Sequence, residues 1–181
     1  QQAPMPKITV LEMPLPLSLE ELFIGTVKKM KITRKVYDRA TGGYQTEQRI
    51  IKVPVAKGLR AGSKLKYSDI GDRHKDSTQD IHFVIQEKQH PLFKREGNDL
   101  YHNVDISLTE SLCGWDRIVP TIDGKNLSVG RAGPTSSTFT ETFPGLGMPN
   151  YGSPTDPGNY IVGVNIKHPD ILTQAQKDSL R

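Results

Sequence analysis

The sequence predicts a mainly β protein: two similar β-sandwich or barrel-like subdomains in tandem, each with one short helix, followed by a short C-terminal helix. The first observation is an internal repeat, because the pattern Ser-Leu-x-Glu-x-x-x-Gly occurs at 18–25 and again at 107–114, 89 residues later. The second is that short alternating segments are separated by turn residues, without long helical periodicity. The third is that 81–88 and 160–167 both run into a His-Pro pair. Together they indicate a duplicated β unit.

In the first unit, residues 7–17 predict an extended strand at a sheet edge, because its prolines lack the N–H that an inner strand needs. Ser18 and Glu21 form a capping box, which starts a short helix that ends at Gly25. The remaining strands are expected at 26–37, 44–55, 63–67 and 81–88, with a hairpin turn at 38–43 and a polar loop at 73–80.

The second unit repeats this plan. Asp123-Gly124 is a type I′ turn signal between two strands, and Thr173 is an N-cap for a final short helix. The strands are expected at 100–106, 115–122, 125–129, 138–143 and 160–167, with the recurring helix at 107–114. We therefore expect a linker at 1–7, a first β subdomain at 8–90, a second at 91–169 and a C-terminal helix at 170–181.

The bulk properties set limits on function. The 181 residues carry a net charge of +4, which is only mildly basic. Cys113, as the sole cysteine, excludes an internal disulfide framework and fits a reducing compartment. The chain has no apolar run of about 18 residues, so we expect no membrane span. The opening Gln-Gln-Ala-Pro-Met-Pro has the composition of a linker, and we expect the chain to be a piece of a longer protein.

The stretch 26–35 carries a dense run of cations. Because successive side chains of a strand point to opposite faces, Lys28, Met30 and Ile32 share one face and Lys29 lies on the other. One interpretation is a half-buried strand whose lysine stem covers an apolar edge. The other is an apolar depression with a charge at its rim, suited to holding a peptide.

The sequence gives little support for catalysis or for metal binding. Cys113 lies in the apolar run Leu-Cys-Gly-Trp and is interpreted as a buried small hydrophobe. The five histidines show no metal-ligand spacing, and no phosphate-binding glycine loop opens a helix. We expect no enzyme activity, no catalytic residue, no metal and no cofactor.

A basic nucleic-acid-binding β module is the alternative function. Lys28 to Lys35 could contact phosphates, but this run lacks interleaved aromatic residues, so nucleic acid is disfavoured as a partner. Charges on an edge strand also protect against aggregation.

Six ordered segments carry a resemblance to a known family: 17–25, 57–62, 83–95, 97–100, 122–124 and 143–149. From about residue 8 to its end, the chain closely resembles the C-terminal substrate-binding region of DnaJ-type (J-domain) co-chaperones. Lys35 to Tyr44 bridges directly across the place of the zinc-binding insert of class A members. The chain therefore resembles a class B (type II, 40-kDa heat-shock) member of the eukaryotic cytosolic type, in which a J-domain would precede this region.

The resemblance implies a peptide-binding cleft in the first unit. Its apolar positions fall on Met13, Leu15, Met30, Ile32 and Phe83. Lys28 falls at the position that meets the acidic Glu-Glu-Val-Asp tail of the 70-kDa heat-shock chaperone. Met30 stands where an aromatic residue is frequent in the family. Further candidates for contact with the acidic tail are Lys29, Arg49, Lys52 and Lys88.

The resemblance also implies partners and a compartment. We expect unfolded client polypeptides and the 70-kDa chaperone as partners, in the cytoplasm with the nucleus as a second compartment. A homodimer is expected through the C-terminal helix, with Leu172, Ala175 and Leu180 at the interface and the helix continuing past Arg181. The second unit, whose hairpin lacks the Lys-Met-Ile face, is expected to act mainly as a spacer.

Overall fold

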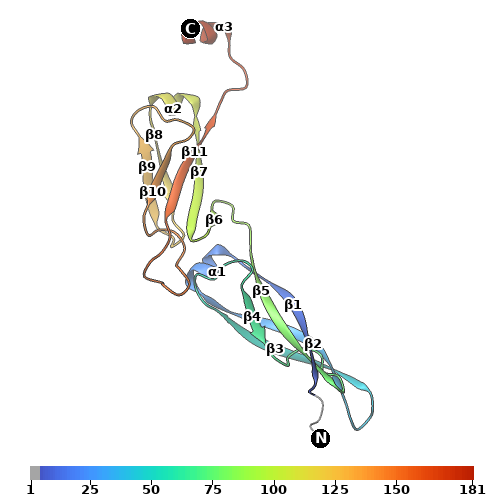
Figure 1. Ribbon diagram of the computed structural model, residues 1–181. Helices are drawn as coiled ribbons and strands as arrows, with labels where there is room; N and C mark the ends of the chain where they lie inside the picture. Colours follow the sequence, from blue (N-terminus) through green and yellow to red (C-terminus); the bar gives the residue numbers. More distant parts are fainter. Residues whose placement is uncertain (1–4) are drawn as a thin grey trace. The chain divides into compact units, whose positions relative to one another are not determined.

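The structure is a computed structural model that describes residues 5–181 (Figure 1). The chain divides into two compact units. The first contains the residues up to His90 together with 149–154, and the second contains 91–148 and 155–181. Several small sheets and three short helices confirm the predicted mainly β class. Of the expected linker 1–7, residues 1–4 lie outside the described part, and Lys7 already belongs to a strand.

The first unit follows the predicted order of elements closely. Its elements are β1 (Lys7–Leu17), α1 (Leu19–Ile24), β2 (Thr26–Tyr37), β3 (Tyr44–Val55), β4 (Lys64–Tyr67) and β5 (Ser77–Glu87). One expectation was wrong: the last strand starts at Ser77 and not at Ile81. Part of the expected polar loop is extended because Ser77 to Asp80 pair with Lys7 to Val10 of β1, which polarity alone does not indicate.

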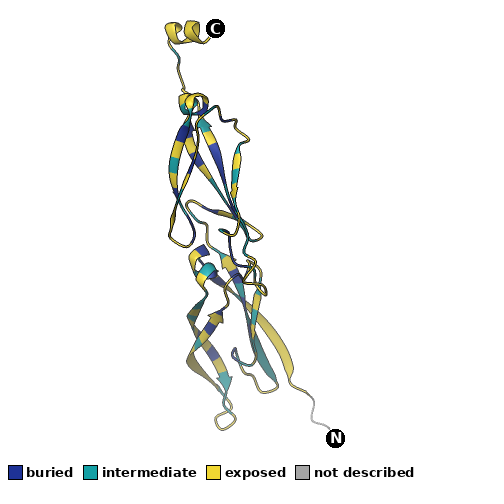
Figure 2. Ribbon diagram, turned by 90° about the vertical axis from the view of Figure 1, so that its left-hand side faces the viewer, coloured by how far each residue is buried: buried dark blue, intermediate teal, exposed yellow. Residues whose placement is uncertain are grey.

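Two sheets build the first unit. One has the order β1-β5-β4, so β1 is an edge strand as its prolines predicted. β1 and β5 pair in parallel, which the sequence did not predict, and β4 pairs with β5 antiparallel. The other sheet is the β2–β3 hairpin, paired along its full length from Thr26–Val55 to Tyr37–Tyr44. Buried residues recur at every second position toward the ends of these strands, which places a core on one face of each sheet (Figure 2).

The core of the first unit is aliphatic with one aromatic centre. Phe83 is fully buried, and its ring meets Tyr67 edge to face at 5.6 Å between centroids. Leu19 and Leu22 of α1 are also buried, so the short helix closes the core at the end of β1. Truncating a buried leucine of this kind to alanine typically costs about 2–5 kcal/mol, because a cavity remains.

Both short helices begin with the predicted capping boxes. The Ser18 hydroxyl accepts from the Glu21 N–H, while a Glu21 carboxylate oxygen accepts from the Ser18 N–H at 2.9 Å. Each helix ends at a glycine with positive φ, Gly25 at 84° and Gly114 at 112°. A Cβ at Gly114 would lie 2.8 Å from the carbonyl oxygen of Ala132, so both conformation and space require glycine there.

The second unit repeats the plan with shorter strands. Its elements are β6 (Lys94–Glu96), β7 (Asp99–Ser107), α2 (Leu108–Cys113), β8 (Trp115–Pro120), β9 (Asn126–Arg131), β10 (Thr140–Phe143), β11 (Tyr160–Lys167) and α3 (Gln174–Leu180). Its larger sheet has the order β10-β11-β7-β6, with β11 parallel to β7 as β5 is to β1. β8 and β9 form a separate hairpin.

The turn of the second hairpin differs from the expected two-residue type I′ turn. The connection spans five residues, and only Gly124 in it has positive φ, whereas type I′ needs two such residues. The Thr121 N–H donates to the Lys125 carbonyl at 2.8 Å, and the Thr121 hydroxyl contacts the Asp123 carboxylate. This local bonding stabilises the longer loop.

α3 has the predicted N-cap, because the Thr173 hydroxyl accepts from the Gln176 N–H at 3.2 Å. No residue of α3 is buried. No helix among residues 5–181 is long and apolar enough to cross a membrane.

Candidate functional site

β2 presents two chemically different faces. The burial pattern alternates along the strand, with Lys28 and Met30 half-buried, Ile32 buried and Lys29 and Lys31 exposed. The face shared by Lys28, Met30 and Ile32 is therefore the inner one. This burial agrees with the half-buried strand, whereas the apolar depression suited to a peptide stays a prediction.

The residues implied for the apolar cleft separate into buried and half-buried side chains. Phe83, Leu15 and Ile32 are 0, 2 and 4 % exposed, so they belong to the core. Met13 and Met30 are half-buried and leave part of their side chains accessible. Met13 lies beside Phe83 in the β1–β5 register. Of the five residues, these two methionines are therefore the ones whose adaptable thioether side chains remain accessible.

Unused strand edges adjoin this face. Among residues 5–181, β1 is paired only with β5, and β2 pairs along its length only with β3. An isolated bridge joins Val36, near the end of β2, to Arg73. The edge of β2 before this bridge, and the outer edge of β1, keep backbone N–H and C=O groups without a strand partner.

Lys28 is held at this site by a carboxylate. Its ammonium contacts Glu21 Oε1, while Glu21 Oε2 accepts from the Ser18 N–H at 2.9 Å. The Lys28 contact, and next the Ser18 N–H, lower the pKa of Glu21 below its usual value. Since an ammonium has three donors and Glu21 is its one partner among the described residues, two donors remain for a ligand.

The other cationic candidates do not lie together. Lys88 lies close enough to Glu21 that its charge also lowers the pKa of that carboxyl. Lys29 and Lys52 are opposite each other in the β2–β3 register, on the exposed face of the hairpin. Arg49 pairs with Ile32 and is exposed. Lys29 and Lys52 therefore lie on the face of β2 and β3 opposite to that of Lys28.

The second unit contains the repeat counterpart of this ion pair. Arg117 lies 89 residues after Lys28, and it binds Glu110 through two parallel contacts of 2.8 and 3.0 Å. Its NH1 also donates to the Asp116 carbonyl at 2.8 Å, and its NH2 to the Asp105 carbonyl at 3.2 Å. All four terminal N–H donors of the guanidinium are therefore used within the protein. Sequence analysis missed both ion pairs, although the two capping boxes contain their acidic partners.

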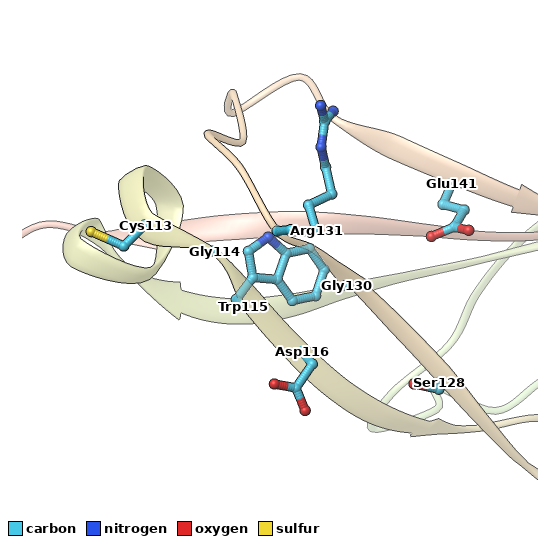
Figure 3. Close-up of a pocket in the computed structure, with 9 residues that line it drawn as sticks. Cys113, Gly114, Trp115, Asp116, Ser128, Gly130, Arg131 and Glu141 are labelled. Atoms are coloured by element: carbon cyan, nitrogen blue, oxygen red, sulfur yellow. The ribbon is translucent and has the colours of Figure 1, made fainter.

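A cavity of about 620 Å³ lies near the end of α2 in the second unit (Figure 3). The Trp115 ring borders it, and its Nε1–H donates to the Thr135 hydroxyl at 2.8 Å.

Cys113 is exposed, so the expectation of a buried cysteine was wrong. The reason is that α2 buries only Ser111, which leaves its last residues facing solvent. No His, Cys, Asp or Glu cluster suited to a metal ion occurs among residues 5–181.

The residues expected at a dimer interface border an apolar cavity of about 660 Å³ between α2, the end of β11 and α3. Leu172 is half-buried, Ala175 is exposed and Leu180 is 66 % exposed. Sequence analysis missed Ile171, which is 86 % exposed, and Leu112, which is 54 % exposed; both line the same cavity.

Comparison with known proteins identifies the family to which the chain belongs. The family model of the DnaJ C terminal domain matches residues 11–169. The chain belongs to the DnaJ C-terminal domain family. This is a family of co-chaperone domains, not of enzymes.

The curated relatives are of the DnaJ subfamily B type. Protein psi1 of Schizosaccharomyces pombe is 45 % identical over 169 residues, which is 93 % of this chain and 44 % of that protein. Protein SIS1 of Saccharomyces cerevisiae is 38 % identical over 177 residues, 97 % of this chain and 49 % of that protein. DnaJ homolog subfamily B member 5 of Homo sapiens is 33 % identical over 168 residues, 92 % of this chain and 48 % of that protein. The chain thus spans about half the length of these relatives.

The Glu110–Arg117 pair predicts an acid-dependent stability of the second unit. The hydrogen bonds from Arg117, and next that from the Ser107 N–H, lower the pKa of Glu110 from 4.5 to about 2. Because the folded-state value is the lower one, this contribution is complete above pH 4.5 and is lost as the pH falls toward 2. Glu110→Gln keeps an acceptor for Ser107. We expect wild type to melt above the variant at about pH 6, and we expect the difference to narrow below about pH 4.5 and to close near pH 2, measured by circular dichroism.

Glu141→Gln is the control, because Glu141 has no ion-pair partner among the described residues. An unchanged difference between wild type and Glu110→Gln across this pH range would contradict the assignment.

Proposed function

We propose that the first unit is the peptide-binding module of a DnaJ-type co-chaperone. It captures apolar segments of unfolded polypeptides and docks the acidic C-terminal tail of the 70-kDa heat-shock chaperone. The observation that carries the proposal is the Lys28 ammonium, which keeps two free donors on the face of β2 that it shares with half-buried Met30. The edges of β2 and of β1, which carries half-buried Met13, have no strand partner along most of their length among the described residues. No covalent bond is made or broken, so the activity is reversible binding. We place this activity in the cytoplasm.

The open edges of β1 and β2 suit an extended peptide. Such a peptide adds as a further strand, and its backbone hydrogen bonds supply affinity that is independent of sequence. Alternate side chains then point toward the methionines, which accept apolar groups of different shape. A module with these two components tolerates many clients, as capture of unfolded chains requires.

An acidic tail adds charge to this mode of binding. Its carboxylates would meet Lys28 and Lys88, the two cations nearest Glu21. Glu21 is then a competitor, because it already occupies one donor of Lys28. A carboxylate of the docked tail therefore either displaces Glu21 from Lys28 or binds a second donor of the same ammonium.

The C-terminal segment supports a homodimer. α3 buries none of its own residues, and the exposed Ile171, Leu112 and Leu180 line one apolar cavity. A second copy would cover these side chains. Two peptide sites in one dimer raise the effective concentration for a client that binds both.

Replacement of the central cation tests the docking site. We expect Lys28→Ala to weaken binding of an octapeptide ending in Glu-Glu-Val-Asp by roughly ten- to hundredfold, because a charge-assisted contact is worth about 1.5–3 kcal/mol. Isothermal titration calorimetry at two salt concentrations measures this change. Lys66→Ala is the matched control, since it removes an exposed lysine from β4 of the same unit.

Two results would count against the proposal. Folded wild type that fails to bind the octapeptide excludes tail docking. Equal weakening in Lys28→Ala and Lys66→Ala shows that only net charge matters.

Removal of the competing carboxylate should have the opposite effect. Glu21→Gln keeps an oxygen that can accept from the Ser18 N–H, but it releases Lys28. We expect the octapeptide to bind about two- to fivefold more tightly, because a partly exposed ion pair contributes up to about 1 kcal/mol. In the same titration Glu110→Gln, the counterpart in the second unit, should leave affinity unchanged. Weaker binding by Glu21→Gln would show that Glu21 positions Lys28 for the ligand.

The dimer is tested by a charge placed at its apolar surface. We expect wild type to dimerise with increasing concentration and Leu180→Asp to remain monomeric, because the new carboxylate would be buried against apolar groups. Sedimentation velocity over a concentration series measures both. Lys177→Asp on the same helix controls for the loss of helix stability. A monomeric wild type at every concentration would refute the dimer.

A further inference from the structure

The outer face of the β2–β3 hairpin is a continuous basic strip. The β-ladder register fixes its members, because directly opposed residues share a face. From one end to the other the opposed pairs are Val27–Pro54, Lys29–Lys52, Lys31–Ile50, Thr33–Gln48, Lys35–Thr46 and Tyr37–Tyr44. We call this set the outer strip. It contains four lysines and no carboxylate.

The charges of the outer strip are not compensated within the protein. No ion pair or hydrogen bond involves the ammonium groups of its four lysines among residues 5–181. On the inner face, in contrast, Lys28 is paired with Glu21 and Arg34 with Glu47. Lys29 and Lys52 are directly opposed, and like charges in this arrangement destabilise a sheet. Folding alone does not favour this pair, whereas an anionic ligand would.

Aromatic side chains end the strip. The Tyr37 and Tyr44 rings meet edge to face at 5.5 Å, and His74 packs against Tyr44 at 5.4 Å. The Tyr44 hydroxyl lies 3.1 Å from His74 Nδ1, which fixes the orientation of both rings. Tyr44 remains 54 % exposed. The aromatic groups that the run Lys28–Lys35 lacks are therefore supplied at the end of the same face.

A cationic cavity of about 380 Å³ adjoins these rings. Arg39, Arg73, His74 and Lys75 line it together with Tyr37, and no acidic residue does. Arg39 and Lys75 have no carboxylate partner among the described residues.

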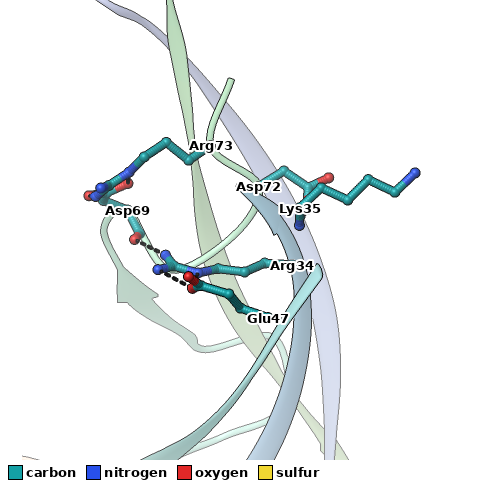
Figure 4. A network of polar contacts seen from close by, with 6 residues as sticks. All are labelled: Arg34, Lys35, Glu47, Asp69, Asp72 and Arg73. Carbon is teal, nitrogen blue, oxygen red and sulfur yellow. Dashed lines mark hydrogen bonds and ion pairs between the residues drawn. The ribbon is translucent and has the colours of Figure 1, made fainter. Parts of the chain in front are cut away.

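Polar contacts hold the walls of this cavity in place (Figure 4). Asp69 holds the Arg73 side chain, and the Arg73 N–H donates to the Lys35 carbonyl at 2.8 Å. Asp72 accepts from the Lys35 N–H at 2.8 Å, and Arg34 links Glu47 to the Asp69 carbonyl at 3.3 Å. The loop that carries Arg73 to Lys75 is thus attached to β2, which keeps the cavity beside the outer strip.

We propose that the outer strip and this cavity bind single-stranded nucleic acid, separately from the peptide site on the inner face. Lysines on alternate residues of one strand repeat at about 6.8 Å and can follow a phosphodiester backbone. Tyr44 offers a ring on which an unpaired base can stack, and the cavity accepts a terminal phosphate. Alternation of a cationic groove with aromatic rings is the pattern of sequence-tolerant single-strand binding. Duplex bases are already stacked, so the tyrosine favours a single strand.

Fluorescence anisotropy with a labelled oligothymidylate and a labelled oligouridylate tests the proposal on this chain. We expect Lys29→Ala/Lys52→Ala to weaken binding about tenfold or more and to reduce the salt slope, by about 0.7 for each phosphate that is no longer neutralised. Tyr44→Leu should weaken binding about five- to hundredfold with an unchanged salt slope, because stacking is worth about 1–3 kcal/mol per base. Lys66→Ala is again the matched control.

Further measurements separate this surface from others. The double lysine variant should bind the acidic octapeptide as wild type does, and Lys28→Ala should bind the oligonucleotides as wild type does. Arg39→Ala should lose the preference for an oligonucleotide with a 5′-phosphate. Circular dichroism establishes that each variant is folded.

Three outcomes overturn the proposal. The first is no binding of either oligonucleotide at low salt by folded wild type. The second is equal affinity for duplex and single strand with no effect of Tyr44→Leu, which would leave a general polyanion surface. The third is that polyglutamate displaces the oligonucleotide as well as a matched nucleic acid does, which would make the strip a site for acidic polypeptides.

Discussion

In each unit, one carboxylate at the third position of a short helix links this helix to the strand before it and to the strand after it. Glu21 accepts the Ser18 N–H with one oxygen and binds Lys28 with the other, so it ties the end of β1, the start of α1 and the first strand of the hairpin together. Glu110 does the same with Ser107 and Arg117 in the second unit. The following glycine, with positive φ, then turns the chain directly into the hairpin. The direction in which β2 leaves the end of β1 therefore depends on this junction.

The two repeats differ at this junction in one functional group. A lysine in the first unit leaves donors unused, whereas an arginine in the second spends its four terminal N–H groups on Glu110 and two backbone carbonyls. The planar fork of arginine favours such bidentate binding, and the ammonium of lysine is a compact charge that can turn to a new partner. The same architecture therefore has a cation available for a ligand in one unit and a structural brace in the other, which agrees with a spacer role for the second unit.

Much of the fold follows from local sequence rules. The alternation in 26–37 and 44–55, the capping boxes and the edge character of the proline-containing β1 each depend on neighbouring residues, and they were predicted correctly. The parallel pairing of β1 with β5 depends on residues 70 positions apart, and it extends β5 back into a segment that is polar enough to suggest a loop. Cys113 was misjudged because an apolar run says nothing about which side of a short helix faces the core.

For the candidate site, the alternation of side chains along a strand correctly placed Lys28, Met30 and Ile32 on one face. The Lys28–Glu21 contact was missed, because it joins a helix to a strand across a glycine turn.

Strand parity also resolves the dense cationic run of β2 into two sets with different chemistry. A single ligand cannot contact Lys28 and Lys29 with equal ease, because neighbouring side chains of a strand point to opposite faces. On the inner face the cation is paired with a carboxylate and shares its face with Met30 and Ile32. On the outer face the lysines lack a partner within the described residues and lead to an exposed tyrosine. An anion bound from outside would relieve the repulsion between Lys29 and Lys52. Because both sets belong to the same hairpin, a ligand that rigidifies one face also orders the backbone of the other.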